Sequence, residues 1–123
     1  MKAVVVEPGA IANLALRNIP VPVPAAHEAL IKVTAFSLNR GEIGFAAGKS
    51  AGTPIGWDVA GVIERAATDG SGQVAGTRVV GWSKNSTGFG EFTCLAANYL
   101  AAIPDGVSDE TACCLPVAGL TAF

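Results

Sequence analysis

The chain has 123 residues, of which 50% are apolar and 15% are charged, and its formal net charge is −2. Half the residues being apolar excludes an intrinsically disordered chain. Only eight residues are basic, and they form no run, which excludes an electrostatic surface for nucleic acid or for an anionic membrane.

The first third of the chain contains three predicted strands. Lys2–Pro8 is a β-branched apolar run, Leu14–Pro24 is an edge strand that leaves into a proline-rich connector, and Glu28–Asn39 is the longest strand. The next segment, Asn39–Pro54, is rich in glycine and has little periodicity, so we predict a loop or a single helical turn.

The rest of the chain predicts further short strands and then helix. Strands are expected at Trp57–Ala66 and Thr77–Trp82, and two more within Phe89–Pro104. Ser108 is a good N-cap for a helix, and Pro116 either ends that helix or begins the next. Six or seven strands with turns at this spacing predict a mainly β fold, a small barrel or sandwich.

Targeting and redox features are few. No apolar run approaches the roughly 20 residues of a membrane span, and the N-terminal apolar stretch is too short for a signal peptide. The three cysteines, Cys94, Cys113 and Cys114, are an odd number that argues against a disulfide framework. We expect a reduced, cytoplasmic protein.

The C-terminal sequence LPVAGLTAF is apolar and has no closing charge or polar tail. We expect the chain to be the front part of a longer protein. An uncovered apolar face here favours a homo-oligomer formed through this segment.

Established catalytic motifs are missing from the sequence. A zinc site needs about three His, Cys or carboxylate ligands, but the only histidine, His27, is predicted in a surface turn. There is no Gly-x-Ser-x-Gly nucleophile elbow and no strand, G-x-G-x-x-G and helix unit for a dinucleotide. We therefore predict no metal site and no complete dinucleotide site within this chain.

Polar residues gather instead at predicted strand ends. They are Asn39, Arg40, Glu42, Trp57, Asp58 and Thr121. Two interpretations stay open from the residues alone. They form a functional site, or they only supply turn chemistry, with Asx turns, solvated charges and a capping carboxylate.

The order of several motifs adds information. MKAVVV, SLNRGEI, PIGWDVAGVIERA, GTRVVG, GFGEF and AAIPDGVSDETACCLPVAGLTAF follow one another along nearly the whole chain. In this order they resemble the N-terminal, GroES-like catalytic domain of the medium-chain dehydrogenase/reductase superfamily. The resemblance implies a GroES-like, partly open barrel with short C-terminal helices, formed by a single domain over residues 1–123 that is truncated before a Rossmann domain.

The resemblance also bears on the metal. In zinc alcohol dehydrogenases of this superfamily a Gly-His-Glu motif precedes the corresponding strand, and its histidine binds the catalytic zinc. Here the motif reads Gly-Trp-Asp, so Trp57 replaces the histidine and Asp58 replaces the glutamate. A further ligand, a cysteine in those relatives, corresponds to Asn39. The chain thus resembles the zinc-independent quinone oxidoreductase and enoyl reductase branch.

Site roles follow from the resemblance. Asn39 would hydrogen-bond near the nicotinamide or the substrate, Arg40 would point to the cofactor pyrophosphate, and Thr121 would lie beside the nicotinamide ring. We add two roles of our own: Trp57 as an aromatic wall and Asp58 as a tether for the Asn39 loop. The catalytic residues expected are thus Asn39, Trp57 and Asp58, and the cofactor-binding residues are Arg40 and Thr121.

The implied activity is reduction of a quinone or an α,β-unsaturated carbonyl by NADPH or NADH, without zinc. Because most of the cofactor would be bound by a domain outside this chain, we expect the chain alone to turn over nothing. The alternative is a non-catalytic barrel module that mediates protein association. A co-chaperonin shares only the barrel type and ranks last.

Overall fold

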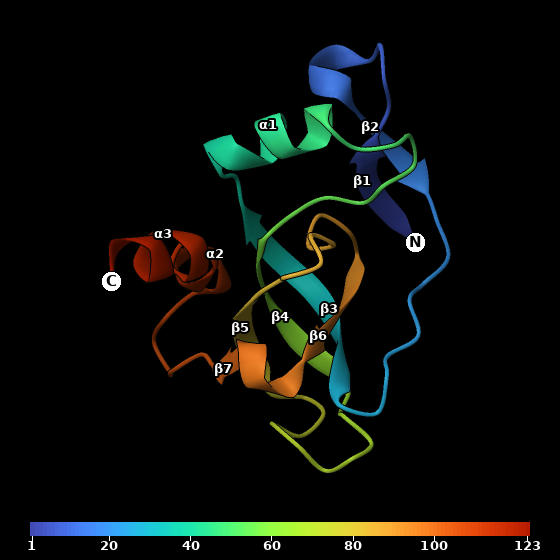
Figure 1. The fold of residues 1–123 in the computed structure, drawn as a ribbon. Helices are drawn as coiled ribbons and strands as arrows, with labels where there is room; N and C mark the ends of the chain where they lie inside the picture. Colours follow the sequence, from blue (N-terminus) through green and yellow to red (C-terminus); the bar gives the residue numbers. More distant parts are fainter.

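The computed structural model describes residues 1–123, which form two antiparallel sheets and three short helices (Figure 1). The mainly β prediction is confirmed, and so is the expected number of strands. The two sheets remain open rather than closing into one continuous barrel.

The smaller sheet pairs β1 (Lys2–Val6) with β2 (Leu14–Asn18), joined by a short 3₁₀ turn at Ile11–Asn13. Isolated bridges connect β1 to the rest of the molecule, through Ala3 with Gly90 and Val5 with Pro54. After β2 the chain runs through the prolines without regular secondary structure, because proline cannot donate to a ladder.

The larger sheet contains the strand ends at which the candidate site residues gather. Its five strands are β3 (Glu28–Ser37), β4 (Asp58–Arg65), β5 (Arg78–Trp82), β6 (Phe92–Ala96) and β7 (Leu100–Ala102). They are all antiparallel, in the order β6-β3-β4-β5-β7. The carboxyl end of β3 lies beside the start of β4, with Ser37 opposite Asp58, which brings two of the polar strand ends together.

The apolar core has three parts. The largest lies on the five-stranded sheet, a second lies under the helix after β3, and a third lies where the C-terminal helices cover the sheet. Their buried members are, in that order, Ala29, Ile31, Val59, Ile63, Val79 and Leu95; Val6, Ala46, Ile55 and Phe89; and Ala60, Ile103, Ala112 and Cys113.

The segment after β3 differs from its prediction. Instead of a loop or one turn it forms α1 (Arg40–Ala47), two helical turns long. The helix begins because Asn39 takes an extended N-cap conformation and the side chain of Glu42, three residues on, accepts a hydrogen bond from the Asn39 amide at 2.7 Å. Burial of Ala46 against the core holds the other end of the helix.

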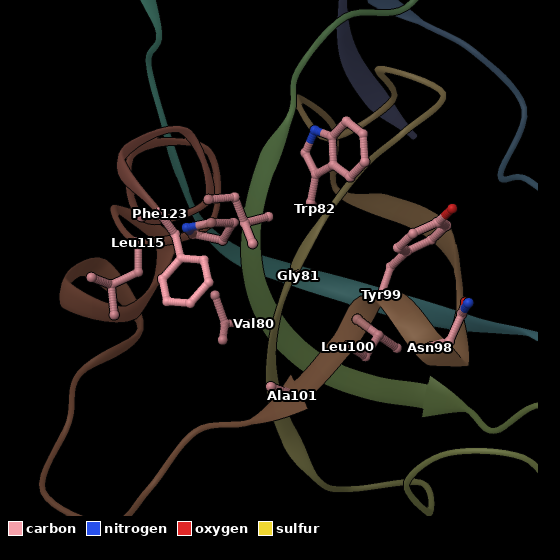
Figure 2. A pocket seen from close by; sticks show the side chains of 12 residues that line it. Val80, Gly81, Trp82, Asn98, Tyr99, Leu100, Ala101, Leu115 and Phe123 are labelled. Atoms are coloured by element: carbon pink, nitrogen blue, oxygen red, sulfur yellow. The ribbon is translucent and has the colours of Figure 1, made fainter.

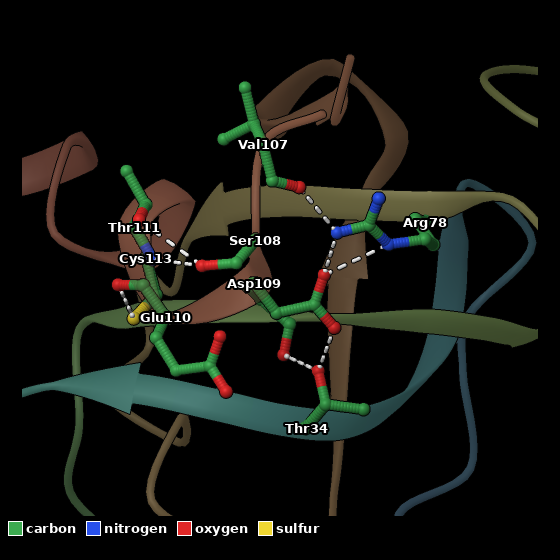
Figure 3. A network of polar contacts seen from close by, with 9 residues as sticks. Thr34, Arg78, Val107, Ser108, Asp109, Glu110, Thr111 and Cys113 are labelled. Carbon is green, nitrogen blue, oxygen red and sulfur yellow. Dashed lines mark hydrogen bonds and ion pairs between the residues drawn. The ribbon is translucent and has the colours of Figure 1, made fainter. Parts of the chain in front are cut away.

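The two C-terminal helices begin as the sequence predicts. Ser108 caps α2 (Asp109–Cys113) by accepting a hydrogen bond from the Thr111 amide, and Pro116 is the first residue of α3 (Pro116–Ala122). Figure 3 shows how α2 is fixed to the sheet. Asp109 accepts hydrogen bonds from Thr34 of β3 at 2.5 Å and from Arg78 Nε of β5 at 3.0 Å.

The three cysteines are free thiols. None of the helices combines the length and the apolar character that crossing a bilayer requires.

Candidate functional site

The site begins in the irregular segment just before β4. Gly56 has φ of +115°, a conformation that favours glycine, and a Cβ there would lie 2.4 Å from the Phe89 backbone nitrogen. The two backbones approach so closely because the Phe89 amide donates to the Ile55 carbonyl and the Gly88 amide donates to the Gly56 carbonyl. This pairing fixes the chain immediately before Trp57.

Trp57 is held from several sides. Its backbone amide donates to Glu42 Oε1 at 2.7 Å, and its indole Nε1 donates to Ser86 Oγ at 2.7 Å. The Phe45 ring meets the indole edge-on, with 6.1 Å between centroids. The indole is therefore oriented by α1 and by the loop after β5, and it is only partly buried.

Asp58 is fully buried, with no exposed surface. Its Oδ2 accepts hydrogen bonds from Ser37 Oγ at 2.6 Å and from Asn39 Nδ2 at 2.9 Å, while its Oδ1 accepts from the Val117 amide at 2.9 Å. One carboxylate thus joins the end of β3, the N-cap of α1 and the first turn of α3. The hydrogen bond between Asn39 and Asp58 is the contact that the predicted tether needs, and the tether role itself stays a prediction.

Glu42 is a second buried carboxylate, 3% exposed. Its two oxygens accept backbone hydrogen bonds from Asn39 and Trp57. Burial raises the pKa of Glu42 above its usual value, and the nearby charge of Asp58 raises it further, against the lowering effect of the two backbone donors. Glu42 therefore fixes the positions of two predicted site residues rather than facing solvent.

A cavity of about 270 Å³, here called the ring cavity, opens beside this network. Its lining residues are Trp57, Trp82, Val117, Leu120 and Thr121. None of them is charged, and the Thr121 hydroxyl and the indole N–H groups are their only polar side-chain groups. Two aromatic walls and a hydroxyl suit a flat ring that bears an oxygen or a carboxamide.

The predicted site residues therefore separate into three groups. Trp57 and Thr121 line the ring cavity. Asn39 and Asp58 lie in the hydrogen-bond network next to it, and Asp58 reaches the cavity wall through Val117. Arg40, the first residue of α1, is exposed and makes no ion pair. The functional roles of these residues remain predictions.

Candidate metal ligands do not converge. No group of three or more His, Cys, Asp or Glu side chains is arranged to hold an ion. His27 is exposed and lines a different cavity, together with Cys94. The two carboxylates at the site, those of Asp58 and Glu42, already accept hydrogen bonds at both oxygens.

Sequence reasoning missed part of the site. Trp82 and Leu120 line the ring cavity, and Ser37 and Ser86 orient Asp58 and Trp57. Ser37 could have been found, because it lies two residues before Asn39 in the predicted strand Glu28–Asn39, where alternate residues share a face. Trp82 is the only other tryptophan, which is a weaker signal.

Comparison of the sequence with known proteins identifies a family. The sequence profile of the alcohol dehydrogenase GroES-like domain matches residues 25–116. Quinone oxidoreductases of Pongo abelii and Homo sapiens are each 33% identical over 111 residues. Those matches cover 86% of this chain but 34% of each relative, so the chain spans about a third of the length of these curated relatives.

Solved structures agree with the sequence matches. The quinone oxidoreductase of Coxiella burnetii has a TM-score of 0.90 at 25% identity, over 99% of this chain and 43% of its own. A mycobacterial protein complexed with NADPH has a TM-score of 0.86 at 27% identity, over 99% of this chain and 39% of its own. The chain belongs to the alcohol dehydrogenase GroES-like domain family.

Proposed function

We propose that this chain is the substrate-binding part of a zinc-independent NAD(P)H-dependent reductase that acts on quinones or α,β-unsaturated carbonyls. The observation that carries the proposal is the ring cavity, in which two indoles and the Thr121 hydroxyl surround uncharged space next to the Asn39–Asp58 pair. The quinone oxidoreductases at 33% identity support the same substrate class.

The residues present fit one side of a nicotinamide cofactor. Thr121 and Trp57 would lie beside its ring, because both line the ring cavity. Arg40 has no ion-pair partner in the chain, so its guanidinium is available to a pyrophosphate. The mycobacterial relative complexed with NADPH supports NADPH as the cofactor. When bound, the cofactor supplies the hydride.

The residues of this chain would then stabilise the oxygen on which negative charge develops. Asn39 Nδ2 has two hydrogens and gives one to Asp58, which leaves the other for a substrate oxygen. Preorganised donors of this kind stabilise an enolate or hydroquinone anion without reorganising during the reaction. A quinone or enone is polarised enough to accept hydride with hydrogen bonding alone, whereas turning an alcohol into an alkoxide needs a Lewis acid.

The domain arrangement is part of the proposal. Residues 1–123 form the GroES-like domain, and a Rossmann domain on the same polypeptide would bind most of the cofactor. On this arrangement the 123-residue chain alone consumes no NADPH.

The test uses the full-length protein that carries this domain. We expect NADPH consumption with a naphthoquinone or an enone, at a rate that a zinc chelator does not change. Asn39→Ala should lower kcat/KM by about 10- to 100-fold with NADPH binding retained. Good NADPH binding without turnover of any quinone or enone would refute the proposal, and so would stoichiometric zinc next to Trp57 in elemental and anomalous-scattering measurements.

A further inference from the structure

Two small residues from different parts of the chain lie against the indole of Trp57. Gly41 is in the first turn of α1, and a Cβ there would lie 2.8 Å from Trp57 Cη2 and 2.9 Å from Cζ3. Ser86 is 3% exposed, and its hydroxyl accepts the indole N–H at 2.7 Å. The far end of the benzene ring and the nitrogen edge of the indole are therefore each in contact with a different segment, so the ring has little room to move.

Gly41 occupies a position where the helix itself would favour a side chain. Its φ is not positive, so the backbone there does not require glycine. Glycine within a helix is less favourable than alanine, because it loses more conformational freedom on folding. The approach of the indole to the helix backbone gives the reason for glycine here. Gly44 in the same helix has no such neighbour, since a Cβ there would meet nothing within 4 Å.

Ser86 has a backbone conformation that disfavours serine. Its φ is +56°, in the left-handed region that glycine adopts without steric cost. The Ser86 amide donates to the Ser83 carbonyl at 2.9 Å, which closes the turn after β5. A residue in this unfavourable conformation supplies the acceptor that fixes a wall of the candidate site, and such a combination points to a functional role.

Trp82, the other aromatic wall of the ring cavity, rests on different contacts. Its ring packs edge-on against Tyr99, with 5.8 Å between the ring centroids, and Figure 2 shows the two side chains next to each other. Its backbone is fixed by the ladder between β5 and β4. A change at Gly41 or Ser86 therefore moves one indole and leaves the other in place, which alters the space between them.

We propose that Gly41 and Ser86 are positioning residues of the reductase and that both act through Trp57. They hold the indole in one orientation, so that the nicotinamide ring beside it meets the hydride acceptor at a reactive distance. This inference rests on the proposed function and adds two residues to it. Because most of the cofactor would be bound outside this chain, the two residues act on the rate of hydride transfer rather than on cofactor affinity.

Four variants separate positioning from stability. Gly41→Ala adds a methyl that presses on the end of the indole, although alanine favours the helix. Ser86→Ala and Ser86→Gly both delete the acceptor, but only glycine relieves the left-handed backbone. Gly44→Ala is the matched control, since it brings the same helix preference at a position with open space around it.

The kinetic test uses the full-length protein with NADPH and a naphthoquinone. We expect kcat to fall about tenfold in Gly41→Ala and in both Ser86 variants, with the KM for NADPH within about twofold of wild type. Misplacing a reacting group by about 1 Å can cost about 100-fold, and a displaced wall transmits part of that displacement. Gly44→Ala should keep the wild-type kcat. Ser86→Gly should unfold at a higher urea concentration than Ser86→Ala, although both lose kcat equally.

Nuclear magnetic resonance of the same protein, labelled with ¹⁵N-tryptophan, observes the indole directly. The Trp57 side-chain signal is the one that Trp57→Phe removes. In Ser86→Gly we expect this signal to shift and its proton to exchange with water about tenfold faster, because the hydroxyl that accepts it is gone. Gly44→Ala should leave the signal unchanged.

The outcomes separate this inference from the proposed function. An unchanged kcat in Gly41→Ala or in the Ser86 variants overturns the inference and leaves the reductase activity standing. The same follows if the Trp57 signal does not move in Ser86→Gly, if the loss appears in the KM for NADPH instead of kcat, or if Gly44→Ala loses as much kcat as Gly41→Ala. Absence of turnover by the wild type refutes the proposed function and this inference with it.

Discussion

Removing the carboxylate of Asp58 is the sharpest test of how the site is built. Asp58 is fully buried and accepts three hydrogen bonds, from Ser37, Asn39 and the Val117 amide. Asp58→Ala deletes all three acceptor contacts at once and leaves three donors inside the protein. Asp58→Asn keeps the shape of the side chain and removes only the charge.

The structure gives the expected size of each effect. A buried donor left without an acceptor costs about 1–3 kcal/mol, and water entering the space relieves part of it, so Asp58→Ala should lower the free energy of unfolding by about 3–5 kcal/mol. In Asp58→Asn the amide oxygen can still accept from the Val117 amide. Its two N–H groups can donate to the Ser37 hydroxyl and to a flipped Asn39 carboxamide. The expected loss is then about 1–2 kcal/mol, mainly from the charge-assisted part of the hydrogen bonds.

Urea unfolding followed by tryptophan fluorescence measures these losses, because Trp57 is the neighbouring residue. Asp105→Ala, at an exposed turn position, is the control and should change the free energy of unfolding by less than about 0.5 kcal/mol. Should Asp58→Ala fail to fold, Ser37→Ala removes one donor and should cost about 1 kcal/mol. Our reasoning is refuted if Asp58→Ala costs under about 1 kcal/mol, or if Asp58→Asn is as damaging as Asp58→Ala.

Three other predictions concern acid stability, backbone strain and thiol reactivity. Burial alone would raise the pKa of Asp109, but hydrogen bonds from its threonine and arginine partners and the arginine charge lower the pKa below 3.8. The wild-type protein should therefore lose stability as the pH falls below that value. In calorimetric scans from neutral to acid pH, Asp109→Asn should lose less stability than the wild type. Gly56→Ala should cost about 3 kcal/mol in urea unfolding, because its φ is positive and a backbone nitrogen lies 2.4 Å from the new methyl; a loss under about 1 kcal/mol would contradict this. Burial raises the pKa of Cys94 and of Cys113 to about 11. At mildly alkaline pH an aromatic disulfide reagent should therefore react quickly with one thiol only, that of exposed Cys114. Cys114→Ser should remove this fast phase of the reaction.

Strands and caps were predictable because their signals are local. β-branched runs closed by glycine or proline marked the strands, and Ser108 marked the start of α2. Helix α1 was not predicted, because Gly41 and Gly44 interrupt the helical pattern. The capping box at the start of α1 could nevertheless have been recognised, because Asn39 and Glu42 stand three residues apart.

The sequence predicted those parts of the site that depend on the identity of a side chain. Trp57 and Asp58 stand out beside each other in the sequence, and the family resemblance pointed to Asn39. The contact from the Val117 amide to Asp58 is invisible in sequence, since every residue except proline has a backbone N–H and the two positions are 59 residues apart. The place of Trp82 in the ring cavity depends on how β5 meets α3, which is a tertiary outcome.

The anchoring of α3 by a single carboxylate has a mechanical consequence. Asp58 accepts a hydrogen bond from the Val117 amide in the first turn of the helix, so any tilt of the helix would turn about that point. Thr121 lies four residues further along, about 6 Å at the helical rise, and a tilt of about 10° would displace it by about 1 Å. Displacements of that size are large for reacting groups, so a tilt of α3 about its anchored first turn would change the width of the ring cavity at Thr121.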